Sequence, residues 1–336
     1  MPKRLIDFEG KPLLNIASYA RRGPGRRDRL SSAEVELISR TVHRAPEVMV
    51  KVLIHGGQDV NAVRRHLGYV NRRGELDIET DDGEQVRGKG VEKKLLEDWD
   101  LDVEEHRRRM DLGPRKDRRP PKLVHKILFS MPPGTPPVRV LEAVKTFARE
   151  EFGLKHRYAM VLHTDEPHPH VHLVVKAISE QGKRLHIRKA TLRQWRLEFA
   201  RNLREHGVTA NATDRAVRGQ EKGHKIDGIY RPMHDEQRSS SHMEARVRAV
   251  TEEITKSGIL LETGKSRLVA TRKEVKRGWL RVSEILLGEG QPELAKYTRQ
   301  FAESMVDPRT EREHIAIKLL HNQSRQRDLK KPGITR

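Results

Sequence analysis

The sequence predicts an α+β domain with a largely antiparallel sheet, followed by a helical region. Short apolar runs that alternate with period two recur between helical patterns in the first 220 residues. Two of these runs are separated by a short polar segment, which indicates a hairpin. From about residue 237 the pattern is helical without interruption. The resulting order of strand, helix, strand, helix, strand, strand and helix is typical of α+β architecture.

The first part of the chain starts with a basic arm over residues 1–45, where we expect weak order and one short helix capped by Ser31 or Ser32. A first strand is expected at residues 47–54, where valine and isoleucine occupy alternate positions. A helix should follow over residues 59–72. The remaining elements expected here are a short strand at 75–80, a helix at 91–99 and a charged, proline-containing loop at 106–122.

The second part should contain a strand at residues 123–130, a helix at 138–152, the two hairpin strands, a short strand at 184–187 and a helix at 189–206. Four apolar side chains of the last helix share one stripe: Leu192, Trp195, Phe199 and Leu203. The opposite face of that helix is basic, because residues 183–204 contain eight lysines and arginines and one acid. Such a face suits contact with phosphates.

Four histidines gather in residues 163–172, between the apolar runs at 159–162 and 173–175. Because a strand alternates faces, His170 and His172 should project from one face, and His163 should end the neighbouring strand. If residues 165–169 turn the chain, three imidazoles converge on one face of the sheet. We therefore predict a metal site with His163, His170 and His172 as ligands.

A solvated polar turn is the plain alternative for any single histidine. Three histidines at this spacing, beside two runs that read as buried strands, favour a metal ion. His168 is out of phase and should face solvent or the other side. Asp165 is the natural acceptor for an imidazole N–H. Histidine ligands suit Zn²⁺ as well as Mg²⁺, so the pattern leaves the ion open.

Charge indicates the class of partner. The 336 residues carry a formal net charge of +20, which points to a polyanion, with nucleic acid as the first candidate and a membrane surface as the second. The absence of cysteine excludes disulfides and thiolate ligands and favours an intracellular setting. No apolar run approaches the roughly 18 residues that cross a bilayer, so we expect a cytoplasmic protein without membrane contact.

Tyr69 has the setting of a reactive group. On the helix expected at 59–72, the apolar stripe consists of Val60, Val63, Leu67 and Val70. Tyr69 lies about 140° from the centre of that stripe, so it is not placed as a core residue. Arg65 and Arg72 share its face and can hold a phosphate against the phenol.

The other tyrosines are weaker candidates for a nucleophile. Tyr158 and Tyr297 lie among apolar residues and look structural, whereas Tyr19 and Tyr230 lie in basic loops. Most exposed tyrosines have no chemical role, and water activated by a metal ion is the alternative nucleophile.

Three stretches resemble one family, the HUH relaxases, and in particular those of mobilisation type P and their relative, the T-DNA border endonuclease. Residues 163–172, with their His-Pro-His-Val-His ending, resemble the third motif of that group. Residues 67–76, Leu-Gly-Tyr-Val-Asn-Arg-Arg-Gly-Glu-Leu, resemble its first motif, and residues 125–134 resemble its central strand. The resemblance extends over residues 47–220.

The resemblance implies a five-stranded antiparallel sheet flanked by helices, a Mg²⁺ or Mn²⁺ ion on the three histidines, and Tyr69 as nucleophile. The implied reaction is nicking and rejoining of single-stranded DNA at an origin of transfer through a 5′-phosphotyrosine. Relaxosome accessory proteins and a coupling ATPase are the implied partners. The expected DNA contacts are Arg65, Arg72, Lys176, Arg188 and Arg193, and the expected accessory residues are His125, His168 and Glu166.

Two positions depart from the family pattern. Pro167 stands where the T-DNA relative has an acid, so the acid that supports the metal ligands is either Asp165 or Glu166. Lys176 stands where that strand ends in asparagine, and it can provide another phosphate contact.

Three rival functions fit part of the pattern: a replication initiator of the same superfamily, a nuclease that uses metal-bound water, and a DNA-binding relaxosome protein with structural zinc. The expected division of the chain is a basic arm at 1–45, a nicking domain at 46–235 and a helical region of unknown role at 236–336.

Overall fold

The computed structural model describes residues 16, 19, 29–54, 57–112, 121–220, 241–258, 260, 262 and 264–329. The described chain divides into two compact units. We call Ser32–Ala212 the sheet unit, and Asn15–Ser31 with Thr213–Arg336 the helical unit. Most of the arm expected at 1–45 lies outside the described residues, but its predicted helix is present as α2, Ser32–Val42.

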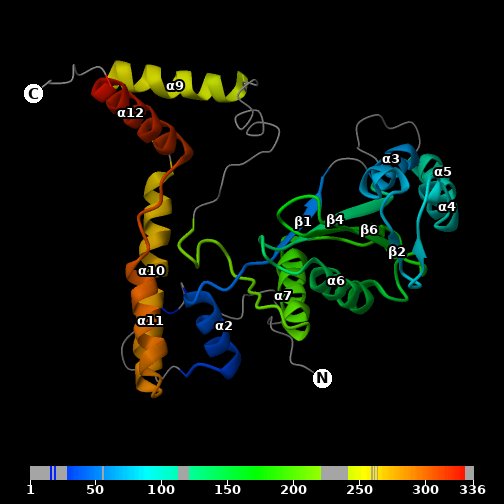
Figure 1. The fold of residues 1–336 in the computed structure, drawn as a ribbon, viewed down its shortest axis with the longest axis horizontal. Helices are drawn as coiled ribbons and strands as arrows, with labels where there is room; N and C mark the ends of the chain where they lie inside the picture. The colour runs from blue at the N-terminus through cyan, green and yellow to red at the C-terminus, as the bar shows by residue number, and fades with distance from the viewer. Residues whose placement is uncertain are drawn as a thin grey trace, which may run out of the picture. The chain divides into compact units, whose positions relative to one another are not determined.

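A single antiparallel sheet forms the centre of the sheet unit (Figure 1). Its strands are β1 Met49–Leu53, β2 Ile78–Thr80, β3 Gln85–Val86, β4 Val124–Ser130, β5 Tyr158–His163 and β6 His170–Lys176. The spatial order is β1-β4-β6-β5-β2-β3, and every neighbouring pair is antiparallel. The predicted α+β class and antiparallel sheet are therefore confirmed.

Two details of the sheet differ from the expectation. It has six strands among the described residues rather than five, because the two-residue β3 pairs with β2 at one edge and is too short to show a period. The strand expected at 184–187 is wrong, since Arg184 makes only an isolated bridge with Ile178.

The helices of the sheet unit cover both faces of the sheet. After α2 they are α3 Val60–Val70, α4 Val91–Asp98, α5 Leu101–Leu112, α6 Pro137–Phe152 and α7 Lys189–Glu205. Figure 1 shows α3, α4 and α5 on one side of the strands and α6 and α7 on the other. Period-two alternation in the strands supplies apolar side chains to both layers.

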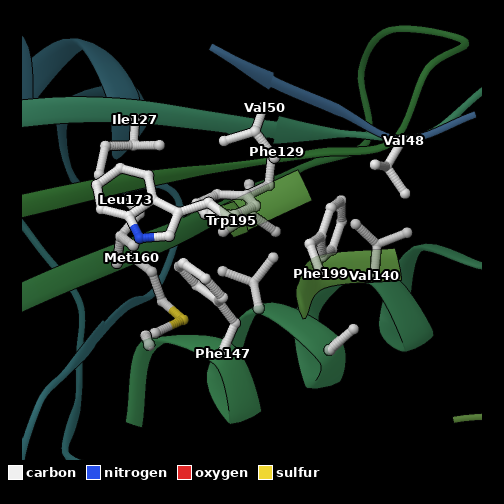
Figure 2. Close-up of a cluster of buried hydrophobic side chains, with 14 of the residues drawn as sticks. Val48, Val50, Ile127, Phe129, Val140, Phe147, Met160, Leu173, Trp195 and Phe199 are labelled. Atoms are coloured by element: carbon white, nitrogen blue, oxygen red, sulfur yellow. The ribbon is translucent and has the colours of Figure 1, made fainter. Parts of the chain in front are cut away.

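The layer under α6 and α7 is the larger core. Figure 2 shows Phe129 from β4 among Phe147 of α6 and Trp195 and Phe199 of α7. The Phe129 ring lies 4.9 Å from that of Phe147 and 5.1 Å from that of Phe199. Each such buried side chain contributes about 1.5–3 kcal/mol. The predicted apolar stripe of the 189–206 helix is thus confirmed.

The layer under α3 positions the candidate site. Val63, Leu67 and Val70 of α3 pack with Val161 of β5 and Val174 of β6. The helix begins where Asp59 caps it, because the Asp59 carboxylate accepts the Ala62 N–H at 2.7 Å. The helix predicted at 59–72 and its apolar stripe are confirmed to within two residues.

The loop expected at 106–122 is wrong over its first seven residues, because α5 continues to Leu112. Residues 113–120 lie outside the described part. The stretch 101–112 contains good helix formers, Glu, Arg, Leu and Met, but has little apolar periodicity. Intrinsic helix propensity therefore accounts for this helix, which the hydrophobic pattern did not indicate.

The helical unit contains α9 Ser241–Ser257, α10 Lys265–Gly288, α11 Pro292–Glu303 and α12 Glu311–Leu329. Trp279 of α10 packs on Phe301 of α11 with ring centroids 5.2 Å apart. The helical structure expected from about residue 237 is therefore present in the described part of the chain, with breaks between α10 and α11 and between α11 and α12. No helix in the described part of the chain combines the length and the apolar composition that crossing a bilayer requires.

Candidate metal and tyrosine site

The three predicted ligands lie on one face of the sheet, where β5 and β6 form a hairpin. His163 and His170 are directly opposed across the two strands, and His172 is two residues further along β6. One ring nitrogen from each histidine lies within 4.8 Å of the others. His163 and His172 are buried, and His170 is half-buried. The structure therefore brings together the three histidines that the sequence singled out.

Two backbone carbonyls orient these rings. His163 Nε2 donates to the carbonyl oxygen of Val70 at 2.6 Å, and His170 Nδ1 donates to that of His168 at 2.9 Å. A carbonyl can only accept, so these contacts fix which nitrogen carries the proton and leave His163 Nδ1 and His170 Nε2 as the lone-pair donors. Val70 ends α3, so a free carbonyl at the end of that helix holds one ligand.

Burial favours the neutral form of two of the three histidines, His163 and His172. Desolvation, together with the neighbouring imidazoles, lowers the pKa of His172 to about 3. Burial also lowers the pKa of His163, although the bond to the Val70 carbonyl works in the opposite direction. Neutral imidazoles are the form that binds metal.

The donor set fits a divalent ion. The triad offers three converging ring nitrogens, and in His163 and His170 the second ring nitrogen is bonded to a carbonyl, as is usual for metal-binding histidines. The C-terminal end of α3, which carries partial negative charge, meets the same site at Val70 and favours a cation there. The histidine triad is therefore able to bind a metal ion.

Tyr69 precedes Val70 on α3 and is 61% exposed. The Arg72 guanidinium carbon lies 5.3 Å from the centre of its ring. Arg72 also pairs with Asp165 and approaches His163 Nδ1 at 3.4 Å. Arg72 thus connects the tyrosine with the triad, as a cation that can reach a phosphate between them.

Asp165 lies closer to Arg72 than to the ligands. Its carboxylate is 3.8 Å from His163 Nδ1 and forms its ion pair with Arg72. Slight burial opposes the change, but hydrogen bonds from its own backbone N–H and from Arg72 lower the pKa of Asp165. The acceptor from the His163 N–H is the Val70 carbonyl and not Asp165, which corrects the sequence-based expectation.

A turn after α3 gives Arg72 its direction. Arg72 and Arg73 both have left-handed backbone conformations, with φ of 53° and 57°. Such conformations cost a non-glycine residue about 1–2 kcal/mol each, so the surrounding structure must hold them. Asn71, which is buried, does so: its carbonyl accepts the Gly74 and Leu76 N–H groups at 3.1 and 2.9 Å, and its side chain accepts from Gly74 at 3.2 Å.

His66 is a residue of the site that the sequence analysis missed. It lies on α3, one turn before Tyr69, with its ring 6.0 Å from that of His172. Burial, and to a smaller extent the neighbouring Lys126 ammonium, lowers the pKa of His66 to about 4. Nothing in the helical pattern distinguished it from the polar positions beside it, because its neighbour across space is on β6.

Several predicted contacts lie apart from the triad. Lys176 is buried at the other end of β6, where its ammonium pairs with Glu180 at 3.2 Å. His125 lies on the sheet face under α6 and α7, with Nε2 donating to the Leu185 carbonyl at 3.2 Å. Arg188 is the N-cap residue of α7 and Arg193 lies within that helix, on that same opposite side. His168 and Glu166 are exposed in the hairpin turn, and His168 contributes its carbonyl to the site.

The other tyrosines differ from Tyr69. Tyr158 is buried, as expected of a structural residue, and Tyr19, considered a loop residue, is buried as well. Tyr297, which was considered structural, is 46% exposed on α11. Tyr230 lies outside the described residues.

The antiparallel sheet carries a His-Val-His strand with a third histidine opposite it, and the exposed Tyr69 lies on the helix that packs over these strands. Residues 69–208 match the family model described as "Relaxase: MobA/VirD2-like, nuclease domain". This part of the chain is therefore similar to MobA/VirD2-like relaxase nuclease domains, and Tyr69 is the first residue of the match.

Similar proteins include the T-DNA border endonuclease VirD2 of Rhizobium radiobacter, 26% identical over 192 residues, which cover 52% of this chain and 43% of that protein. The VirD2 protein of Agrobacterium fabrum is 25% identical over 192 residues, 52% of this chain and 41% of the relative. The chain thus spans less than half the length of these relatives.

Among solved structures, the MobM relaxase domain bound to plasmid oriT DNA, in a manganese-bound crystal structure, is 17% identical, with a TM-score of 0.36, over 56% of this chain and 99% of that one. A structure concerned with vancomycin resistance transfer in Staphylococcus aureus is 18% identical, with a TM-score of 0.24, over 31% of this chain and 63% of that one.

Proposed function

We propose that the sheet unit nicks and rejoins one strand of DNA at an origin of transfer, with Tyr69 as nucleophile and a divalent ion on His163, His170 and His172. One observation carries the proposal. The tyrosine and the carbonyl that orients a metal ligand are consecutive residues of α3, so a single rigid helix positions both.

The reaction exchanges one phosphodiester for another. The phenol oxygen of Tyr69 attacks the scissile phosphorus, the bond from phosphorus to the 3′ oxygen breaks, and the proton lost by the phenol is balanced by the proton gained at the released 3′ hydroxyl. A divalent ion, when bound, withdraws charge from the scissile phosphate. The product is a 5′-phosphotyrosine, which the 3′ hydroxyl of the strand can attack to rejoin the DNA.

Arg72 stabilises charge in this reaction. Its guanidinium lies over the Tyr69 ring and close to His163, so it faces both the forming bond and the metal site. Although burial opposes it, hydrogen bonds to Tyr69 and Asp165 raise the pKa of Arg72, which keeps it charged. Asp165 then acts by holding Arg72 in place, and this is the role that we propose for it.

The finer assignments are part of the same proposal. The ion is Mg²⁺ or Mn²⁺, the substrate is single-stranded origin DNA, and relaxosome proteins and a coupling ATPase act with the enzyme in the cytoplasm. The proposed functional division is an arm at 1–45, a nicking domain at 46–235 and a helical region at 236–336. The basic charge of the chain, +20, supports a DNA partner.

The decisive experiment tests for the covalent adduct. The full chain is incubated with Mn²⁺ and a 3′-labelled oligonucleotide from the DNA flanking the gene, and the products are separated in detergent. The wild-type protein should yield a labelled protein–DNA adduct, and Tyr69→Phe should abolish it while still binding the oligonucleotide. Tyr297→Phe, which changes another exposed tyrosine, is the matched control and should react as the wild type does.

The outcomes separate the rival functions. Strand cleavage without an adduct, lost in His163→Ala but kept in Tyr69→Phe, would establish water as the nucleophile. An adduct that persists in Tyr69→Phe would disprove the assignment of the nucleophile. A protein that binds DNA but unfolds on chelation, without cleavage, would be the zinc-stabilised binding protein.

A further inference from the structure

A basic hollow adjoins Tyr69 on the surface of the sheet unit. It has a volume of about 900 Å³ and is lined by residues of α3, of the turn after α3 and of the start of α4. Its charged lining residues are Arg64, Arg65, Arg72, Arg73, Lys89, Glu75 and Glu92. Five cations therefore face two carboxylates, and the hollow has an excess of positive charge.

Most of these cations have no acidic partner. Within the described part of the chain, Arg64, Arg65, Arg73 and Lys89 form no ion pair, and all four are exposed. Arg157, another arginine of the sheet unit, does have acidic partners, Asp81 and Asp98. A group of unpaired cations around one hollow repels itself unless an anion binds there.

Two loops are clamped together to build the hollow. The Gly88 N–H donates to the Gly74 carbonyl at 3.2 Å. Gly74 has a φ of +96°, and a Cβ there would lie 2.4 Å from the Gly88 carbonyl carbon. Only glycine allows this approach, which brings Lys89 beside the Arg72–Arg73 turn.

The second loop also contributes a helix start. Gly90 is the N-cap of α4 and has no side chain to bond the first N–H groups of the helix. Gly90 lines the hollow, so the positive end of the α4 dipole lies at its edge. Together with the unpaired cations, these N–H groups form a surface that suits a phosphate.

We infer that this hollow binds a second, non-scissile phosphate of the same DNA strand. The inference rests on the proposed function and deepens it. Arg72 belongs to both places, because it lines the hollow and also reaches Asp165 and His163. A phosphate held by Arg73 and Lys89 is thereby adjacent to the one held between Tyr69 and the metal site. Holding two neighbouring phosphates fixes the register of the strand, and so selects which bond faces Tyr69.

The test measures binding separately from cleavage. In a Tyr69→Phe background, the full chain is titrated with the origin oligonucleotide and with versions that each carry one uncharged methylphosphonate linkage. Loss of the charge at one linkage beside the scissile one should weaken binding roughly tenfold, as expected for a charge-assisted contact. Adding Arg73→Ala and Lys89→Ala should remove the effect of that linkage and leave the effects of the others unchanged.

Lys93→Ala provides the control. Lys93 is an exposed lysine of α4 that pairs with Glu97 and does not line the hollow. It should keep the wild-type pattern of all linkages. If the double alanine variant still responds to every linkage, or if Lys93→Ala abolishes the same response, the second phosphate site does not exist.

A second readout shows which proposal has failed. With Tyr69 restored, the Arg73→Ala and Lys89→Ala variant should still form the adduct, but at more than one position along the oligonucleotide. Cleavage at a single position would contradict the role in register. The wild-type adduct, measured in parallel, reports on the proposed function alone, so its absence would refute that function and not only the second site.

Discussion

Replacing Gly74 with alanine tests how the two loops beside Tyr69 are held together. The new Cβ would meet the Gly88 carbonyl carbon at 2.4 Å, its oxygen at 2.5 Å and the Lys89 nitrogen at 2.7 Å. All three are backbone atoms, so no side chain can move aside. The loops must separate, and the hydrogen bond from Gly88 to Gly74 must break.

Two costs add up in this variant. A left-handed φ costs alanine about 1–2 kcal/mol relative to glycine. The lost hydrogen bond costs about 1 kcal/mol more. We expect Gly74→Ala to lower the free energy of unfolding by about 2–3 kcal/mol, or the melting temperature by about 2–4 °C for each kcal/mol in a domain of this size.

Gly83→Ala is the matched control. Gly83 has a φ of +88°, but no atom lies within 4 Å of the position its Cβ would take. This variant should lose only the conformational term, about 1–2 kcal/mol. Thermal unfolding of both full-length variants measures the difference, and hydrogen exchange at residues 74–90 should quicken only in Gly74→Ala. Equal losses with equal exchange would refute the claim that this contact joins the loops.

Three further predictions concern separate parts of the sheet unit. His163→Ala should weaken Mn²⁺ binding at least tenfold in a calorimetric titration, whereas His168→Ala, which keeps its carbonyl, should bind as the wild type does. Burial lowers the pKa of His125 from 6.5 to about 4, so the unfolded state takes up a proton at higher pH than the folded state does, and the free energy of unfolding should fall as the pH drops from 6.5 to 4. His125→Gln should flatten that decline in acid titrations. An unchanged slope would exclude His125 as the source of the decline. Asp59→Ala should cost about 1 kcal/mol of stability in urea denaturation, because it removes the cap of α3; no loss would mean that the cap contributes nothing.

The sequence was most informative where periodicity determines which way a side chain faces. Alternation along β6 placed His170 and His172 on one face, and the short link to β5 brought His163 opposite them. The 3.6-residue repeat of α3 separated Tyr69 from the buried stripe, and the structure leaves it exposed. In both cases the rule needs only neighbouring residues of one element.

Contacts between elements were not predictable in the same way. The Val70 carbonyl acts through a main-chain atom, which every residue possesses, so no residue type indicates it in the sequence. His66 meets His172 only because α3 packs over β6. Asp165 was expected to accept a hydrogen bond from a histidine, but its carboxylate instead forms an ion pair with Arg72, which lies 93 positions earlier in the chain.

The bond between the Val70 carbonyl and His163 has a consequence for how this site can change over generations. Because the acceptor is a main-chain oxygen, substitutions at position 70 leave it in place as long as α3 keeps its course. Only packing constrains the side chain of residue 70, so substitutions there leave the orientation of the ligand His163 unchanged. A shift of the helix by even one residue would instead displace the tyrosine and the ligand's support together, so variants in this region should lose both properties at once or neither.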